Sequence, residues 1–84
     1  MNCKIAISTS GHDLSEVYVM FQCSQEEVLL ANGKNRTIAK PKRKNPKHVT
    51  IVSCKDSKLE EMLMKCCNDE MIRQTVLYYK KKLL

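Results

Sequence analysis

Glycine, proline and aromatic residues are scarce in this sequence. Its 84 residues include two glycines, two prolines, three tyrosines, one phenylalanine and no tryptophan. So little glycine and proline excludes a collagen-like or low-complexity chain. Few aromatic rings disfavour a single-stranded nucleic-acid binder that stacks successive bases on several rings. Charged residues make up 29% and hydrophobic residues 43%, which is a globular composition.

Long hydrophobic runs are also missing. No segment reaches the roughly 18 consecutive apolar residues of a membrane helix, and residues 1–4 lead into an alternating segment, not into the apolar stretch of a signal peptide. We therefore expect a cytoplasmic protein with no membrane partner. The cysteines are odd in number and lack a Cys-x-x-Cys pair, so we expect neither a disulfide framework nor a zinc site. They are Cys3, Cys23, Cys54, Cys66 and Cys67.

Catalytic patterns are equally hard to find. A chain of 84 residues supports one modest core and no deep cleft. Two histidines and five cysteines would permit a Cys–His dyad, but no nucleophile elbow, metal motif or glycine-rich phosphate loop accompanies them. We therefore expect a protein that is not an enzyme and that has no cofactor and no small-molecule substrate.

Hydrophobic alternation predicts strands before residue 55, and helical spacing follows it. Five short strands separated by tight turns indicate a small antiparallel barrel. The Asn32-Gly33 pair predicts a two-residue type I′ hairpin turn, and Pro41 is expected to end the strand after it. The expected strands lie around Cys3, Ile5 and Ile7, and at about 16–23, 26–31, 35–40 and 48–53.

Two amphipathic helices are expected after the barrel. Residues 57–60 (Ser-Lys-Leu-Glu) have the form of a capping box, and Asn68 is expected to cap the second helix. The inner stripe of that helix is predicted as Ile72, Thr75, Val76, Tyr79 and Leu83. We expect residues 1–55 to form the barrel and residues 56–84 to pack on it as part of a single domain.

Positive charge is the first functional signal. The net charge is +6, and seven of the fifteen Lys and Arg residues fall between residues 34 and 48, where no acid interrupts them. Residues 40–48 hold two prolines and predict a stiff, extended basic loop. Such density favours phosphate binding; a solvated loop or a nuclear-localisation signal is the alternative. The candidate RNA-binding residues are Lys34, Arg36, Lys40, Lys42, Arg43, Lys44, Lys47 and His48.

Two further candidates lie near the first turn. Residues Gly11, His12 and Asp13 follow the first strand, where a hairpin needs a glycine with positive φ and His12 could contact a phosphate or a base. Tyr18 alternates with Val17 and Val19 and is therefore predicted on the opposite strand face, where its ring could stack on a base.

These residues resemble a known family. The strand around Ile5, the Gly11–Asp13 turn and the following strand resemble the KOW motif of ribosomal and transcription-elongation proteins. Residues 30–49 (LANGKNRTIAKPKRKNPKHV) resemble a segment of small bacterial KOW-domain RNA-binding proteins, which are similar to large-subunit ribosomal proteins. Residues 68–73 are similar to the C-terminal part of that family.

The resemblance implies an SH3-like barrel that binds structured RNA, with ribosomal RNA the expected target and ribosomal proteins as further partners. It implies no catalysis. This chain departs from the family in one place, because the family's turn continues Asp-Lys-Gly whereas Asp13 is followed by Leu14 and Ser15. A cation and a glycine are thus missing from the turn, which moves the expected RNA contact to residues 40–48.

We therefore expect a non-catalytic RNA-binding protein. A protein–protein interaction module, using the barrel or the methionines of the helices (Met62, Met64 and Met71), is the alternative. A DNA-binding role is a third possibility.

Overall fold

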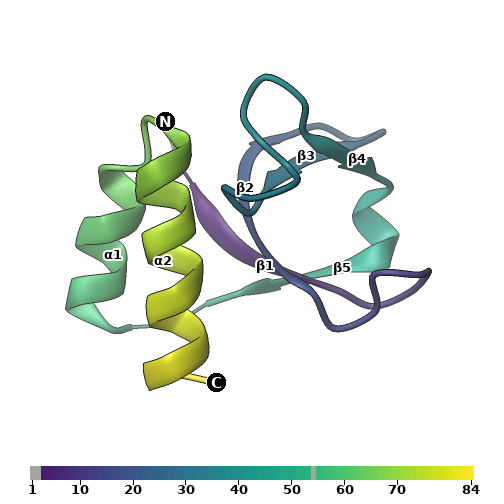
Figure 1. Ribbon diagram of the computed structural model, residues 1–84. Helices are drawn as coiled ribbons and strands as arrows, with labels where there is room; N and C mark the ends of the chain where they lie inside the picture. The colour runs from purple at the N-terminus through teal and green to yellow at the C-terminus, as the bar shows by residue number, and fades with distance from the viewer. Residues whose placement is uncertain (1–2, 54) are drawn as a thin grey trace.

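Five antiparallel strands form a curled half-barrel, and two helices follow it (Figure 1). The computed structural model describes residues 3–53 and 55–84. The small SH3-like barrel with two C-terminal helices is confirmed in this half-barrel form. The elements are β1 (Lys4–Ser8), β2 (Val17–Cys23), β3 (Val28–Ala31), β4 (Lys42–Lys44), the 3₁₀ helix η1 (Pro46–His48), β5 (Val49–Val52), α1 (Ser57–Met64) and α2 (Asp69–Lys82).

The strand order is β4-β3-β2-β1-β5. Strand β1 pairs with both β2 and β5, so Ile5 lies opposite Val19 on one side and Val52 on the other. A bulge between Met20 and Gln22 shifts the register of β2 against β3. Such bulges bend a strand and increase its twist, which helps the short sheet to curl.

Both faces of the sheet are covered by hydrophobic side chains. One face packs against the helices: Ile5 and Val19 form a cluster with Leu59 of α1 and Ile72 of α2. The other face lies inside the curl and buries Tyr18, which packs with Ala6, Met20, Val28 and Leu30. The helices thus lie side by side against one face (Figure 1) and complete the core of the half-barrel.

The expected fourth strand is wrong in position. Residues 35–40 form a loop, and the strand that pairs with β3 is β4, with Lys42 opposite Leu30 and Lys44 opposite Val28. The prediction of a two-residue hairpin turn is also wrong, because ten residues, 32–41, connect β3 to β4. The Asn32 Oδ1 atom accepts hydrogen bonds from the backbone N–H groups of Lys34 and Arg36, so its side chain organises a wider loop than a type I′ turn.

The helix starts are partly as expected. Asp56, not Ser57, caps α1, because its Oδ1 atom accepts the Leu59 N–H at 2.8 Å. Asn68 caps α2 as predicted and accepts the Met71 N–H at 2.9 Å. The predicted inner stripe of α2 is confirmed: Ile72, Thr75, Val76 and Tyr79 are buried and Leu83 packs partly buried against them.

Three kinds of feature are absent from the described parts of the chain. None of their helices is both long and apolar enough to cross a membrane. No group of three or more His, Cys, Asp or Glu side chains in residues 3–53 and 55–84 is placed to hold a metal ion. The four described cysteines are free thiols, with Cys3 and Cys66 buried and Cys23 and Cys67 exposed; Cys54 lies outside the described residues.

Candidate nucleic-acid interface

The basic segment is not one extended loop. Its residues 34–41 belong to the loop between β3 and β4, residues 42–44 form an edge strand, and residues 46–48 form η1. The prediction of a stiff loop over residues 40–48 is therefore wrong, although both prolines lie at the edges of these elements. Five candidates are exposed, namely Lys34, Lys40, Arg43, Lys47 and His48; Arg36, Lys42 and Lys44 are partly buried.

Two of the eight candidates have acidic partners. Lys44 donates from Nζ to Asp13 Oδ1 at 2.9 Å and to the Ser10 carbonyl at 3.0 Å, and only 10% of its side chain is exposed. Arg43 forms an ion pair with Glu27 at 2.7 Å between two well-exposed side chains, and such surface pairs are weak. Lys44 is therefore part of the fold, whereas Arg43 remains accessible.

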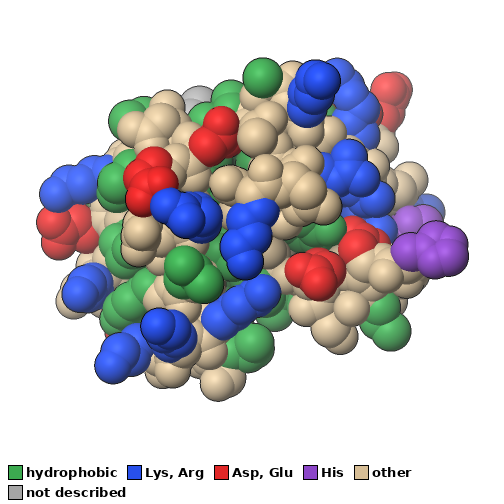
Figure 2. All heavy atoms as spheres, viewed as in Figure 1, with side chains coloured by type: hydrophobic (Ala, Val, Ile, Leu, Met, Phe, Trp, Pro, Cys, Tyr) green, Lys and Arg blue, Asp and Glu red, His purple; other side chains and the backbone are tan. Residues whose placement is uncertain are grey.

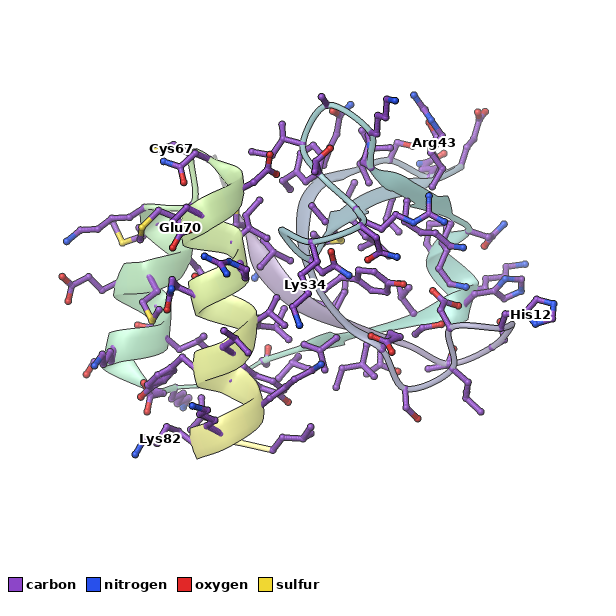
Figure 3. The ribbon with its side chains drawn as sticks, viewed as in Figure 1. His12, Lys34, Arg43, Cys67, Glu70 and Lys82 are labelled. Atoms are coloured by element: carbon purple, nitrogen blue, oxygen red, sulfur yellow. The ribbon has the colours of Figure 1, made fainter. Side chains whose placement is uncertain are left out.

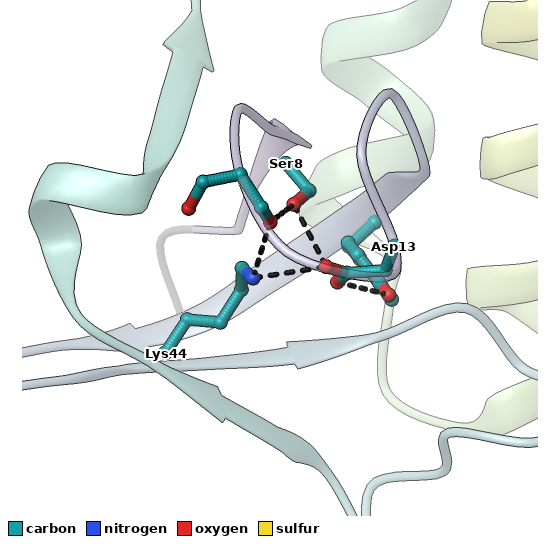
Figure 4. A network of polar contacts seen from close by, with 5 residues as sticks. Ser8, Asp13 and Lys44 are labelled. Carbon is teal, nitrogen blue, oxygen red and sulfur yellow. Dashed lines mark hydrogen bonds and ion pairs between the residues drawn. The ribbon is translucent and has the colours of Figure 1, made fainter.

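Asp13 lies at the centre of a polar network at the β1–β2 turn (Figure 4). Its carboxylate accepts hydrogen bonds from Ser8 Oγ at 3.0 Å, Tyr18 OH at 2.8 Å and Lys44 Nζ at 2.9 Å. Burial raises the pKa of this carboxyl, but these three hydrogen bonds and the Lys44 charge outweigh burial and hold the pKa well below its usual range. The network ties the turn to β4.

The structure places the other candidates near this turn, Gly11, His12 and Tyr18, in different environments. Gly11 has φ of +89°, as predicted for the turn, and His12 is exposed. Tyr18 is only 4% exposed, which contradicts the expectation of a ring free to stack on a base. Burial first, and then its hydrogen bond to Asp13, raise the pKa of the Tyr18 phenol above its ordinary value. Tyr18 thus stays neutral as a hydrogen-bond donor inside the curl.

A hollow of about 520 Å³ opens between the half-barrel and α2. It brings together three of the predicted cations and two cations of α2, namely Lys34, Arg36, Lys42, Arg73 and Lys80. Two acids, Asp13 and Glu16, also line it, and the Asp13 charge is compensated by Lys44. Figure 2 shows that Lys and Arg side chains spread over this face from α2 to the strands.

The loop between β3 and β4 is fixed directly to the start of α2. A Cβ atom on Gly33 would lie 2.5 Å from the Asp69 carbonyl oxygen and 2.6 Å from Arg73 Cβ, so only glycine permits this approach. The Ile38 N–H also donates to Asp69 Oδ1 at 2.8 Å. These contacts hold Lys34 beside α2 (Figure 3), whereas Arg43 lies at the outer edge of the half-barrel.

Sequence reasoning missed the two cations of α2. Arg73 and Lys80 are seven residues apart and so lie on one helix face, beside Val76 and Leu77, which also line the hollow. The seven-residue spacing could have shown that the two cations share a helix face. It could not have shown that this face lines the hollow, because that depends on the packing of the β3–β4 loop against α2. Arg73 also forms an ion pair with Glu70, so its charge is partly compensated.

Several cations of the site have no acidic partner. In the described parts of the chain, Lys34, Arg36, Lys42 and Lys80 have no ion-pair partner. Side chains of this kind bind phosphate and release its condensed counterions. Comparison of the chain with known protein families found no matching family model, and comparison with characterised proteins found no relative.

Proposed function

We propose that this chain is a non-catalytic RNA-binding protein of the cytoplasm that binds structured RNA, with ribosomal RNA as the target class. The basic residues of the β3–β4 loop, of β4 and of η1 contact the phosphate backbone. The resemblance of residues 30–49 to KOW-domain RNA-binding proteins supports the choice of RNA over other polyanions.

The observation that carries this proposal is an excess of basic side chains without an ion-pair partner. Of the eight basic residues between positions 34 and 48, only Arg43 and Lys44 form ion pairs among the described residues. Three of the others line the hollow together with Lys80 of α2, which also has no ion-pair partner in the described residues, and with Arg73, which pairs with Glu70. Fixed positive charge of this density attracts a polyanion and makes its affinity depend on salt.

The mechanism is recognition of shape and backbone. Lysine and arginine on short, tied elements position the protein along phosphates, and contacts to 2′-hydroxyl groups distinguish RNA from DNA. The Asp13–Lys44 network positions the turn and β4 without contacting RNA itself.

A salt titration with a labelled structured RNA tests the proposal. If about six phosphates are engaged, log K falls with log salt at a slope of roughly −4 to −5, and duplex DNA competes poorly. The double variant Lys40→Ala, Lys47→Ala flattens the slope by about 1.5–2. Its control, Lys55→Ala with Lys82→Ala, removes the same charge from exposed residues outside the basic segment and changes the slope by less than half as much.

Two results would reject the proposal. One is an RNA affinity that is undetectable at low salt. The other is an equal effect of the two double variants, which would mean that net charge and not the basic segment attracts RNA. Equal competition by duplex DNA would instead favour a DNA-binding role.

A second candidate function, protein binding, is favoured by one observation. Met64, at the end of α1, is 82% exposed, and exposed methionines suit adaptable partner surfaces. If this function is correct, the chain associates with a partner protein, and the affinity of that association depends little on salt. The Met64→Lys variant loses the association and keeps its RNA affinity. Tyr78 of α2 is already engaged within the chain, because its hydroxyl donates to Asp56 Oδ1 at 3.0 Å and Lys58 lies over its ring.

A further inference from the structure

The hollow beside α2 has a shape that contact with a duplex backbone does not need. Cations that protrude from a convex surface are sufficient to contact phosphates along a helix. Here the cations surround a concave space of about 520 Å³, within the range of pockets that hold small ligands. A concave space of this size can admit a small ligand or one nucleotide.

The wall of the hollow is partly apolar and firmly built. Val17 of β2 and Val76 of α2 are 1% and 5% exposed, so both belong to the core and are held by it. Leu77, which is half-buried, lies beside Val76. A bare phosphate gains nothing from such a surface, whereas the flat face of a nucleobase does.

Side-chain amide groups on the wall of the hollow can donate hydrogen bonds to a ligand. The Asn32 Oδ1 atom accepts from two backbone N–H groups, and one N–H of its Nδ2 group donates to Asn35 Oδ1 at 2.9 Å. The Asn35 Nδ2 group makes no hydrogen bond within the described residues and remains a donor on the wall of the hollow. Asparagine amides pair well with base edges.

We propose that the hollow takes one unpaired nucleotide of a structured RNA. This inference rests on the proposed RNA binding and names the part of the RNA that is recognised. The phosphate lies between Lys34 and Lys80, beside Arg73, which also pairs with Glu70, and the base lies on the half-buried Leu77. Proteins read RNA mainly at loops and bulges, where bases are splayed out of the helix, and a paired A-form stem is too wide to enter a pocket of this size.

The test compares two RNA hairpins with the same stem, one fully paired and one with a single bulged nucleotide. The wild-type chain prefers the bulged hairpin by about tenfold, as expected from burying part of one base. Bulged adenosine and bulged uridine are measured separately. Adenosine 5′-monophosphate and inorganic phosphate are added to ¹⁵N,¹³C-labelled protein, and only the nucleotide shifts the Leu77 methyl signals.

Two variants and one control test whether the preference for the bulge arises in the hollow. Lys80→Ala reduces the preference for the bulge at least threefold, and Lys81→Ala, its exposed neighbour outside the hollow, leaves it unchanged. Leu77→Trp fills the hollow without changing charge; it removes the preference and leaves affinity for the paired hairpin intact. Retained affinity for the paired hairpin also shows that this variant is folded.

The outcomes separate this inference from the proposed function. Equal affinity for both hairpins, with the expected salt slope, would overturn the nucleotide site and keep RNA binding. Equal effects of Lys80→Ala and Lys81→Ala on the preference would also overturn it. Shifts at Leu77 with inorganic phosphate alone would mean a phosphate site, not a nucleotide site. If neither hairpin binds at low salt, the proposed function itself fails.

Discussion

At the β1–β2 turn, the Asp13 carboxylate accepts hydrogen bonds from the side chains of Ser8, Tyr18 and Lys44. Lys44 and Asp13 are 10% and 13% exposed in their side chains, so the ion pair is shielded from water. Removing one partner of such a pair leaves the other charge buried and uncompensated, which is more destabilising than losing a surface pair. The network makes Asp13 a determinant of stability.

Asp13→Asn is therefore expected to lower the free energy of unfolding by about 2–3 kcal/mol at pH 7. The pKa of Asp13 is lowered in the folded protein, so its contribution is complete above the unfolded pKa of about 3.9 and is lost as pH falls toward the folded pKa. The difference between wild type and variant should shrink below about pH 4. Urea unfolding under reducing conditions at pH 7 and pH 2.5 measures it; an equal difference at both pH values would contradict this account.

At the scale of elements, sequence patterns predicted those strands and helices that contribute side chains to the hydrophobic core. Alternation around Ile5 and Val19 and helical spacing from Ile72 to Tyr79 correspond to core contacts. The strand β4 carried no such pattern, because its sequence is Lys-Arg-Lys. An edge strand needs only one hydrogen-bonded neighbour, and charged residues there discourage pairing with other chains. The cations that predicted a loop are thus compatible with an edge strand.

The candidate site was predictable only in part for a similar reason. Charge density identified Lys34, Arg36 and Lys42, which do line the hollow. Arg73 and Lys80 join them because the β3–β4 loop packs on α2, a non-local contact that local patterns do not contain. The ion pair of Lys44 with Asp13 joins residues 31 positions apart, so local sequence patterns could not predict it either.

The docking of the β3–β4 loop on α2 depends on Gly33. Gly33→Ala places a methyl group 2.5 Å from the Asp69 carbonyl oxygen at φ of +78°, so it should cost about 2–4 kcal/mol from backbone strain and overpacking together. Gly11→Ala is the matched control, because φ is +89° but the nearest atoms lie at 3.4 and 3.5 Å. It should cost only the strain, about 1–2 kcal/mol. Urea unfolding compares them, and equal losses would mean that the close approach is unimportant.

At the scale of the whole molecule, the largest hydrophobic cluster is shared by both halves of the chain. Ile5, Val17 and Val19 of the strands contact Leu59, Ile72, Val76 and Tyr79 of the helices in one cluster. Neither half buries these side chains alone. A chain of this size has little core to spare, so the half-barrel and the helices should unfold together.

Native-state amide hydrogen exchange in the full chain tests this cooperativity. The slowest-exchanging amides of β2, near Val19, and of α2, near Val76, should report the same free energy of opening, because both exchange only when the shared core separates. Ile72→Ala should lower both values equally, by about 2–4 kcal/mol. A variant that lowers protection in α2 while β2 keeps its full value would show that the helices form a separate unit. The hollow beside α2 would then lack the fixed wall on which nucleotide binding depends.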